Sequence, residues 1–312
     1  MKSSQEFLLQ ETKIKMAPQR ARQQNQPPAS YSSMLKIVIE SINSQREAGI
    51  SLNLFLVGFT VCLFLNSSSF FFSLLTISLH ATLVYIILYE LDSLRKYFPI
   101  PDSCINSLKM TEAHQAVAKR AYFLGTFVGI GKFLFHHSDS WNNFGIWLCI
   151  LAFFHWSEYF FTAISNPANL GIKSFLLDHS KEYHAAACIA LLEYLLERWI
   201  FPSIKLGNGL SFFNWLGFFL CIGGETFRKL AMVTCGTNFN HLIEYSNRKD
   251  HVLVKNGVYG IVRHPSYTGW FVWSIGTQFI LGNPICVLVY AWASWSFFKE
   301  RIPDEEDTLI HR

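Results

Sequence analysis

The chain has 312 residues, of which 51% are hydrophobic and only 15% are charged. Soluble domains carry about 25% charged residues, and a soluble core cannot bury this much apolar surface. Disorder is excluded because it requires low hydrophobicity, and a formal charge of +4 is too small to indicate a nucleic-acid partner. The composition therefore predicts an all-α integral membrane protein.

Residues 1–48 are polar, rich in Gln, Ser, Lys and Arg, and contain Pro27-Pro28. No apolar segment opens the chain as it would in a cleaved signal peptide. This composition predicts a disordered N-terminal tail.

Eight apolar runs follow and predict about eight transmembrane helices. Residues 49–232 contain the first six: Ile50–Leu65, Phe70–Leu91, Tyr122–Phe135, Phe144–Ile164, Ala185–Phe201 and Phe212–Met232. Residues 233–312 contain a polar stretch and two final runs, Tyr267–Leu281 and Ile285–Phe298. Both final runs are short against the roughly 20 residues that span a bilayer. The turn signal Gly282-Asn283-Pro284 between them predicts a helical hairpin.

Lysine and arginine are distributed unevenly between successive loops. They are frequent in the tail, in the loops after the second, fourth and sixth runs, and at the C-terminus. The opposite loops hold little beyond Lys132 and Lys205. Because such residues favour the cytosolic side, we expect both termini and the polar stretch after residue 233 to be cytosolic.

Ionisable residues also occur inside the predicted spans, where they are costly and are candidates for function. They include His155, Glu158, Glu193, Glu225 and Arg228. Glu225 and Arg228 are three residues apart on one helix, so they share a face on which they can pair. The alternative interpretation of each carboxylate is a buried network that only holds helices together.

Polar chemistry is concentrated on both sides of the predicted hairpin. One region runs from Gly236–His241 to Arg263–Trp270, and the other is Lys299–Asp307. A hairpin would bring RHPSYTGW and ERIPDEED together on the cytosolic face. Arg301 can then hold a carboxylate through a two-pronged bond, and Glu305 can accept bonds from hydroxyl or ammonium groups. This combination suits an adenosine cofactor with a carboxylate tail, and the alternative is a charged interface with a Trp–Tyr belt.

The motif RHPSYTGW, with GTNFNH before it and an acidic run after the hairpin, is similar to isoprenylcysteine carboxyl methyltransferases. The same resemblance extends over roughly residues 50–310 and includes FHWSEYFFTAISNP (Phe154–Pro167), SFLLDHSKEY (Ser174–Tyr183), RKLAM (Arg228–Met232), NGVYGIVRHPSYTGWFVWSIGTQ (Asn256–Gln278) and NPIC (Asn283–Cys286). RHPxYxG also occurs in phospholipid methyltransferases and sterol reductases, so the specificity lies in the whole set.

The resemblance implies a multi-pass enzyme of the endoplasmic reticulum membrane. Such an enzyme uses S-adenosyl-L-methionine to methylate the C-terminal prenylcysteine carboxylate of CaaX-processed proteins, including those of the small GTPase type. It implies contact with membrane lipid, no nucleic acid and no metal, and the sequence shows no zinc-type spacing of Cys and His. Residues 233–312 would form the catalytic region, with a cytosolic cofactor pocket, the hairpin and a short C-terminal segment.

The resemblance also assigns site residues. The cofactor would contact Glu244, His251, Val252, Leu253, Val254, Tyr259, His264, Pro265, Ser266, Tyr267 and Glu305. Arg301 would bind the substrate carboxylate as a catalytic residue, and Arg228 is the second catalytic candidate. The carboxylate of Glu244 departs from the amide of relatives.

Three other functions are compatible with parts of the pattern. A phospholipid N-methyltransferase would share the cofactor pocket but would not need Arg301. A sterol reductase would need a nicotinamide site, and a transporter or scaffold would use Glu158, Glu193 and Glu225 as a relay. Relatives also continue past the acidic run with an aromatic, basic tail, so a catalytically impaired, truncated isoform is a further expectation.

Overall fold

The computed structural model describes residues 46–60, 78–82, 112–138, 140–178, 180–205, 210–243 and 252–310. These residues belong to one compact unit, Ser41–Arg312. Within them every regular element is a helix, which confirms the predicted all-α class. The predicted tail lies outside the described residues except for its last three positions, and the run Phe70–Leu91 is described only at 78–82.

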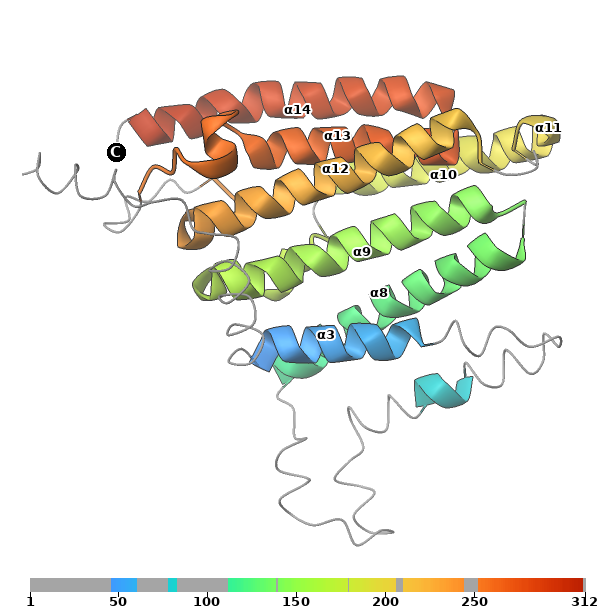
Figure 1. The fold of residues 1–312 in the computed structure, drawn as a ribbon, viewed down its shortest axis with the longest axis horizontal. Helices are drawn as coiled ribbons and strands as arrows, with labels where there is room; N and C mark the ends of the chain where they lie inside the picture. Colours follow the sequence, from blue (N-terminus) through green and yellow to red (C-terminus); the bar gives the residue numbers. More distant parts are fainter. Residues whose placement is uncertain are drawn as a thin grey trace, which may run out of the picture. The chain divides into compact units, whose positions relative to one another are not determined.

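The main helices follow the predicted apolar runs (Figure 1). They are α3 (Arg46–Phe59), α8 (Glu112–His137), α9 (Asn142–Ser165), α10 (Lys181–Ile200), α11 (Pro202–Lys205), α12 (Phe212–Cys235), α13 (Pro265–Leu281) and α14 (Pro284–Ile310). Short 3-10 helices are η1 (Pro167–Asn169), η2 (Ile172–Phe175), η3 (Gly236–Asn238) and η4 (Gly257–Gly260). Among the described residues, α9 is the one helix that is long and apolar enough to cross a membrane by length and composition.

Local chemistry explains several helix ends. Ser211 begins α12 through a reciprocal pair of bonds with Asn214, which satisfies N–H groups that have no partner inside the helix. Pro265 occupies the first turn of α13, where its missing N–H costs nothing. Gly282 ends α13 at a φ of 68°, a conformation that favours glycine.

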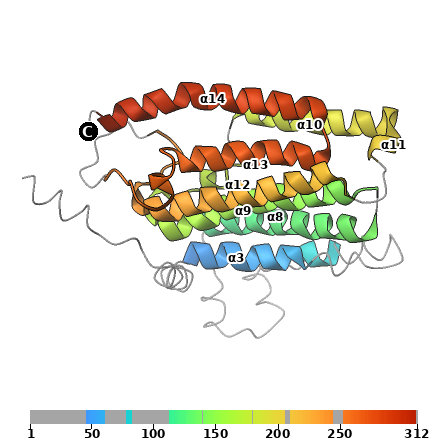
Figure 2. The same cartoon turned by 45° about the horizontal axis from the view of Figure 1, so that its top comes forward.

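Helices α12 and α13 lie side by side in both views and pack closely (Figure 2). Gly224 on α12 faces Gly269 on α13, and a Cβ atom on Gly224 would lie 2.5 Å from the Gly269 carbonyl oxygen. Small residues of this kind let two membrane helices approach through their backbones. The close approach places Arg228 of α12 against the first turn of α13.

Helix α9 connects the two sides of this unit. It contacts α3 and α8 on one side and α12 and α13 on the other (Figure 1). The ring of Phe154 stacks on that of Trp273 of α13 at 4.0 Å between centroids. Phe154, Trp273, Trp147 of α9 and Tyr194 of α10 all belong to one buried core cluster. This packing fixes the rotation of α9 and so determines where its polar residues point.

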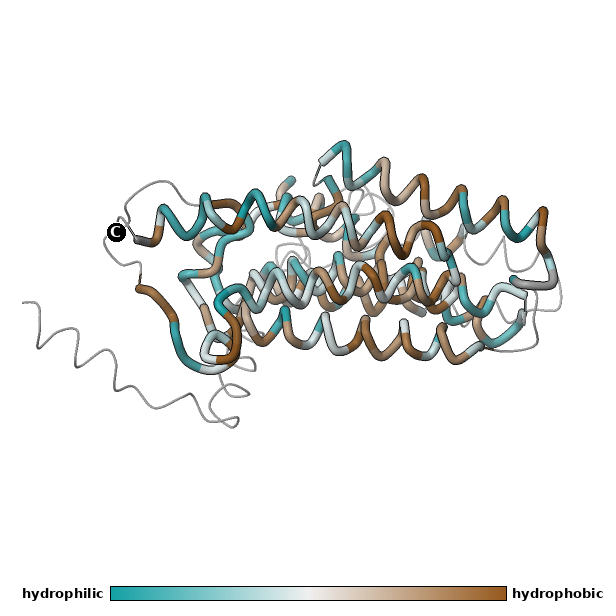
Figure 3. Tube along the Cα trace, turned by 90° about the horizontal axis from the view of Figure 1, so that it is seen from above, coloured by the Kyte–Doolittle hydropathy of each residue, from teal (hydrophilic) through white to brown (hydrophobic). Residues whose placement is uncertain are grey.

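Helix α14 is longer than the sequence indicates. The last apolar run ends at Phe298, yet the helix continues to Ile310 and includes Pro303. The polar residues 299–307, which the sequence placed after the last apolar run, are therefore helical, and Figure 3 shows frequent hydrophilic residues where α14 approaches the C-terminus. Hydropathy marks where apolar character ends, but a polar helix can continue past that point. Arg301 and Glu305 are consequently one turn apart on one face.

A buried polar cluster surrounds the connection between α13 and α14. The Lys205 ammonium donates to the carbonyl oxygens of Leu281 at 2.8 Å and Gly282 at 2.7 Å, and it pairs with Glu197 at 2.8 Å. The Glu193 carboxylate accepts bonds from the first backbone N–H groups of α14, at 2.8 and 2.7 Å. We call Glu193, Glu197, Lys205 and Asn283 the turn cluster.

Candidate active site

A cavity of about 120 Å³ lies between the α12–α13 connection, the start of α13 and the end of α14. We call it the loop cavity. Its lining includes these residues that the sequence assigned to the cofactor: Val252, Leu253, Val254, Tyr259, His264, Pro265, Ser266, Tyr267 and Glu305. Glu244 and His251, which were assigned to the same group, lie outside the described residues. Residues from three separate segments are thus brought to one cavity.

The connection that lines this cavity is held by its own polar groups. The backbone N–H of Val252 donates to the Asn238 side chain at 3.0 Å. Tyr259 lies on η4, and its burial, together with the nearby Cys235 and Glu305, keeps the pKa of its hydroxyl far above the usual value. The Tyr259 hydroxyl therefore stays protonated at neutral pH.

The two polar regions on either side of α13 and α14 are in contact. The Tyr267 hydroxyl donates to the Glu305 carboxylate at 2.5 Å, and the rings of His264 and Tyr267 stack at 5.4 Å between centroids. Glu306 pairs with Arg263 at 3.0 Å and with His264 at 3.2 Å. RHPSYTGW and the acidic run therefore lie next to each other, as the turn signal indicated.

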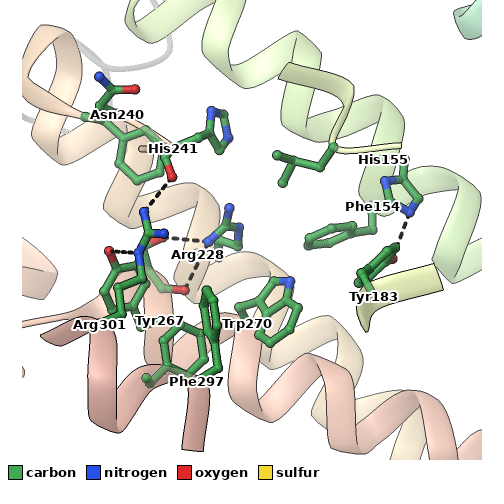
Figure 4. A pocket seen from close by; sticks show the side chains of 14 residues that line it. Phe154, His155, Tyr183, Arg228, Asn240, His241, Tyr267, Trp270, Phe297 and Arg301 are labelled. Atoms are coloured by element: carbon green, nitrogen blue, oxygen red, sulfur yellow. Dashed lines mark hydrogen bonds between the residues drawn. The ribbon is translucent and has the colours of Figure 1, made fainter. Parts of the chain in front are cut away.

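A second cavity of about 50 Å³ adjoins the first, and we call it the aromatic cavity (Figure 4). It is lined by Phe154, His155, Leu176, Tyr183, Arg228, Phe239, Asn240, His241, Ser266, Tyr267, Trp270, Phe297, Phe298 and Arg301. Phe239, Asn240, Ser266 and Tyr267 line both cavities. A molecule in one cavity is thus separated from a molecule in the other only by this shared wall.

Arg301 connects the two cavities through Tyr267. Its Nε donates to the Tyr267 hydroxyl at 2.9 Å, and its Nη2 donates to the His241 carbonyl oxygen at 2.7 Å (Figure 4). Tyr267 in turn donates to Glu305, which lines the loop cavity. A guanidinium has five N–H donors in a fixed plane, so Arg301 keeps donors beyond these two bonds to the described residues.

Arg228, the second catalytic candidate, has a different environment. Its Nε and Nη2 donate to the two oxygens of Glu158 at 2.6 and 2.8 Å, and its Nη1 donates to the Ser266 hydroxyl at 2.7 Å. Glu158 is completely buried and also contacts Lys229 and the His241 ring. We call Glu158, Glu225, Arg228, Lys229 and His241 the site cluster.

The pair of Glu225 with Arg228 that the helix spacing allowed is not among the ion pairs of the described residues. Glu225 instead pairs with Lys229 at 3.2 Å and accepts a bond from Ser157 at 2.5 Å. Arg228 is bound by Glu158 of α9, seventy residues earlier in the chain. The spacing along one helix shows which residues share a face, but the rotation of a neighbouring helix decides which partner is nearer. The two carboxylates offset the charges of the two cations within the cluster.

Several residues in or beside the site were not assigned to it from the sequence. His155, which lines the aromatic cavity, and Glu158, which binds Arg228 behind the wall, carried a detectable signal, because they are ionisable groups inside an apolar run. Tyr183, Trp270 and Phe297 carried none, because aromatic residues are frequent throughout this chain. Among the described residues, no group of three or more His, Cys, Asp or Glu side chains is placed to hold a metal ion.

A third cavity, of about 150 Å³, lies between α9, α10, α13 and α14, and we call it the four-helix chamber. It shares Tyr183, Trp270 and Phe297 with the aromatic cavity. Its remaining lining is largely apolar, with small side chains such as Ala187 and Ala293. The three cavities therefore form a series from a polar end to an apolar one.

This all-helical protein combines a polar cavity with an aromatic cavity and an apolar chamber, and neighbouring spaces share lining residues. It can join a polar reactant to an apolar one, as a membrane-embedded transferase does. Comparisons with known proteins agree with this class. The model of the isoprenylcysteine carboxyl methyltransferase family matches residues 215–311, which include the residues described here on the loop cavity and Arg301.

Individual relatives extend the match. The protein-S-isoprenylcysteine O-methyltransferase of Xenopus laevis is 49% identical over 195 residues, 62% of this chain and 67% of the relative. That of Rattus norvegicus is 48% identical over 195 residues, 62% of this chain and 68% of the relative. A solved structure of a eukaryotic intramembrane Ras methyltransferase of this type superimposes with a TM-score of 0.74 at 36% identity, covering 86% of this chain and 91% of that one. The chain belongs to the isoprenylcysteine carboxyl methyltransferase family.

Proposed function

We propose that the protein transfers a methyl group from S-adenosyl-L-methionine to the C-terminal carboxylate of a prenylated cysteine. Its substrates are CaaX-processed proteins, including those of the small GTPase type. Family membership and the names of the relatives support this activity. The observation that carries it is the Arg301–Tyr267–Glu305 chain of hydrogen bonds, which connects the wall of the loop cavity to the wall of the aromatic cavity.

The loop cavity has the chemistry that this cofactor requires. Glu305 offers a carboxylate for hydroxyl or ammonium groups, and residues 252–254 offer apolar surface for a purine ring. Ser266 and Tyr267 lie in the first turn of α13, where backbone N–H groups have no partner within the helix and suit an anion. When bound, the cofactor supplies an already activated methyl group. Glu244 and His251 are proposed to complete this pocket.

Arg301 is proposed to orient the substrate carboxylate in the aromatic cavity. A C-terminal carboxyl group has a pKa of about 3.3–3.7, so it is ionised at neutral pH and no general base is needed. Two parallel N–H bonds from a guanidinium fix the plane of a carboxylate. Holding reactants in this way can contribute about 7–11 kcal/mol to lowering a barrier. Arg228, bound to Glu158 and Ser266, fixes the wall between the two cavities.

The prenyl chain is proposed to lie on the apolar side of the series, in the aromatic cavity and the four-helix chamber. Phe297 and Trp270 lie on the side of the aromatic cavity away from His241 (Figure 4), and Phe298 also lines the cavity. These rings exclude water from the reacting carboxylate, which strengthens its interaction with Arg301.

The same proposal includes a location. We place the protein in the endoplasmic reticulum membrane as a multi-pass protein of about eight helices, with both termini and the loop cavity on the cytosolic side. The uneven distribution of Lys and Arg supports this orientation. Helices α13 and α14 would form the predicted hairpin inside the bilayer, with the connection at Gly282-Asn283 away from the cytosol.

The test is methyl transfer from labelled S-adenosyl-L-methionine to N-acetyl-S-farnesyl-cysteine, in membranes that contain this chain. We expect a base-labile methyl ester. Label in phospholipid, stable to base, would instead favour the phospholipid N-methyltransferase, which the named relatives do not support. The Xenopus laevis relative, expressed in parallel, is the positive control. Ester from that control but not from this chain would contradict the proposal and favour a catalytically impaired isoform.

A further inference from the structure

Tyr183 stands where the aromatic cavity meets the four-helix chamber. It lines both spaces, together with Trp270 and Phe297. Trp270 and Phe297 come from α13 and α14, which pack against each other, whereas Tyr183 comes from the first turn of α10. The boundary between the aromatic cavity and the chamber is therefore formed from two sides. Trp270 and Phe297 form one side, and Tyr183 is the contribution of α10.

A hydrogen bond to His155 of α9 holds the Tyr183 side chain. The Nδ1 of His155 lies 2.9 Å from the carbonyl oxygen of Phe175, which can only accept, so Nδ1 carries the hydrogen. In the neutral ring Nε2 is then an acceptor, and the Tyr183 hydroxyl, 2.9 Å away, donates to it. His155 is buried, and Figure 4 shows this pair on the side of the cavity opposite Arg301. The ring of Tyr183 is thus fixed in position rather than free to turn.

Helix α10 is otherwise attached mainly at its other end. Glu193 binds the first N–H groups of α14, and the Asn283 side chain donates to the Ala190 carbonyl oxygen at 2.8 Å. The Tyr183–His155 bond ties the first turn of α10 to α9. The position of the Tyr183 ring therefore depends on this bond.

The chamber behind the wall suits a hydrocarbon chain. The hydroxyl groups that α13 contributes to it are already paired, since Ser274 donates to the Phe271 carbonyl oxygen at 2.9 Å and Thr277 to the Ser274 carbonyl oxygen at 2.6 Å. Hydroxyl groups that are already hydrogen-bonded within the protein lose no partner when an apolar ligand binds beside them. The small side chains of Ala187 and Ala293 leave the space open.

On the basis of the proposed function, we propose that Tyr183, positioned by His155, determines the length of prenyl chain that the enzyme prefers. A chain whose carboxylate lies at Arg301 reaches the chamber only by passing between Tyr183, Trp270 and Phe297. The size and position of the Tyr183 ring therefore decide how much of a 20-carbon chain fits beyond the point where a 15-carbon chain ends. Tyr183 is a specificity-determining residue, and His155 is a positioning residue.

The experiment measures kcat/KM for N-acetyl-S-farnesyl-cysteine and for N-acetyl-S-geranylgeranyl-cysteine, and follows their ratio. Tyr183→Ala should shift the ratio toward the longer chain by about tenfold, since single methylenes in an apolar pocket are discriminated by that order. Tyr183→Trp should shift the ratio in the opposite direction. The control is Tyr194→Ala, also a buried tyrosine of α10 but on the wall of neither cavity. It should lower both values equally.

The role of His155 has its own readout. His155→Phe and Tyr183→Phe each remove the hydrogen bond and should shift the ratio in the direction of Tyr183→Ala by a smaller factor. The double substitution should shift it no further, because one bond is being removed twice.

An unchanged ratio in active Tyr183→Ala overturns the inference and leaves the proposed function intact. If Tyr183→Ala does not bind the cofactor, Tyr183→Leu is measured in its place. A kcat/KM ratio that moves in the same direction for Tyr183→Leu and Tyr183→Trp also overturns the inference. A wild-type chain that methylates neither substrate contradicts the proposed function instead.

Discussion

Two buried ionic clusters lie at opposite ends of α13, and they use their charges differently. In the turn cluster, the three donors of the Lys205 ammonium face two carbonyl oxygens, the Asn283 side chain and Glu197. In the site cluster, Arg228 and Lys229 are also paired, but the neighbouring Arg301 keeps donors beside a cavity. The turn cluster joins helix ends. The site cluster holds the wall between the loop and aromatic cavities, next to the Arg301 guanidinium, which keeps N–H donors for a ligand.

This difference shows how a membrane helix bundle separates stability from chemistry. Buried charges are costly unless each is paired, so both clusters pair theirs. At the site, Glu158 pairs with Arg228 and also binds the ring of His241. The backbone carbonyl oxygen of His241 accepts a hydrogen bond from Arg301. Arg301 is thus positioned through His241 without being neutralised by the same carboxylate.

The largest expected effect is on catalysis. Arg301→Ala should lower kcat/KM for the prenylcysteine substrate by about 100-fold or more, because the carboxylate is no longer aligned. Affinity for the cofactor, measured by equilibrium binding, should be largely kept. Arg120→Ala on α8 is the control, since it removes an arginine that lines neither the loop nor the aromatic cavity. Equal losses of catalysis and cofactor affinity would contradict the role of Arg301.

Glu158→Gln tests the centre of the site cluster. It leaves Arg228 buried with a neutral partner and Lys229 with Glu225 alone, and breaking a buried pair in this way costs about 3–5 kcal/mol. We expect a loss of that order in the free energy of unfolding, measured by denaturant titration in detergent. Adding Lys229→Gln should restore part of it, because the cluster then holds one cation, Arg228, and one carboxylate, Glu225. A double variant as unstable as the sum of the two single variants would show that the charges are not coupled.

Lys205→Met makes the equivalent change in the turn cluster. The loss of charged hydrogen bonds to the C-terminal end of α13 should lower the free energy of unfolding by about 1.5–3 kcal/mol. Because the cluster lies at the far end of α13 from Arg301, kcat/KM per folded enzyme should not change. A selective loss of kcat/KM at full stability would mean that the two clusters do not divide their tasks as described.

The smallest expected effect concerns the close contact between α12 and α13, which places Arg228 against α13. Gly224→Ala should lower the free energy of unfolding by about 1–3 kcal/mol, because the added methyl group would overlap the Gly269 carbonyl oxygen and the Trp273 backbone. Gly223→Ala is the matched control, since a Cβ atom there meets nothing within 4 Å. Its better helix propensity should raise helix stability by up to about 1 kcal/mol. Similar losses from both variants would exclude close packing as the cause.

Some features of the site could be predicted because they depend on short stretches of sequence. The apolar runs correspond to helices where they are described, and Pro265 and Gly282 mark the bounds of α13. The segment 252–254 and the residues His264–Tyr267 line one cavity with Glu305, as the resemblance indicated. Local hydropathy, turn residues and motif identity are sufficient for these conclusions.

The sequence by itself therefore determined the class of protein, most helix positions and the segments that line the loop cavity. The tertiary structure decided which charges meet: Glu158 rather than Glu225 binds Arg228, because the packing of Phe154 on Trp273 sets the rotation of α9. It also decided that α14 continues through Pro303 and that Tyr183 reaches the wall of two cavities. The physical reason is that helix periodicity is encoded within a few residues, whereas the relative rotation of two helices depends on side chains far apart in the chain.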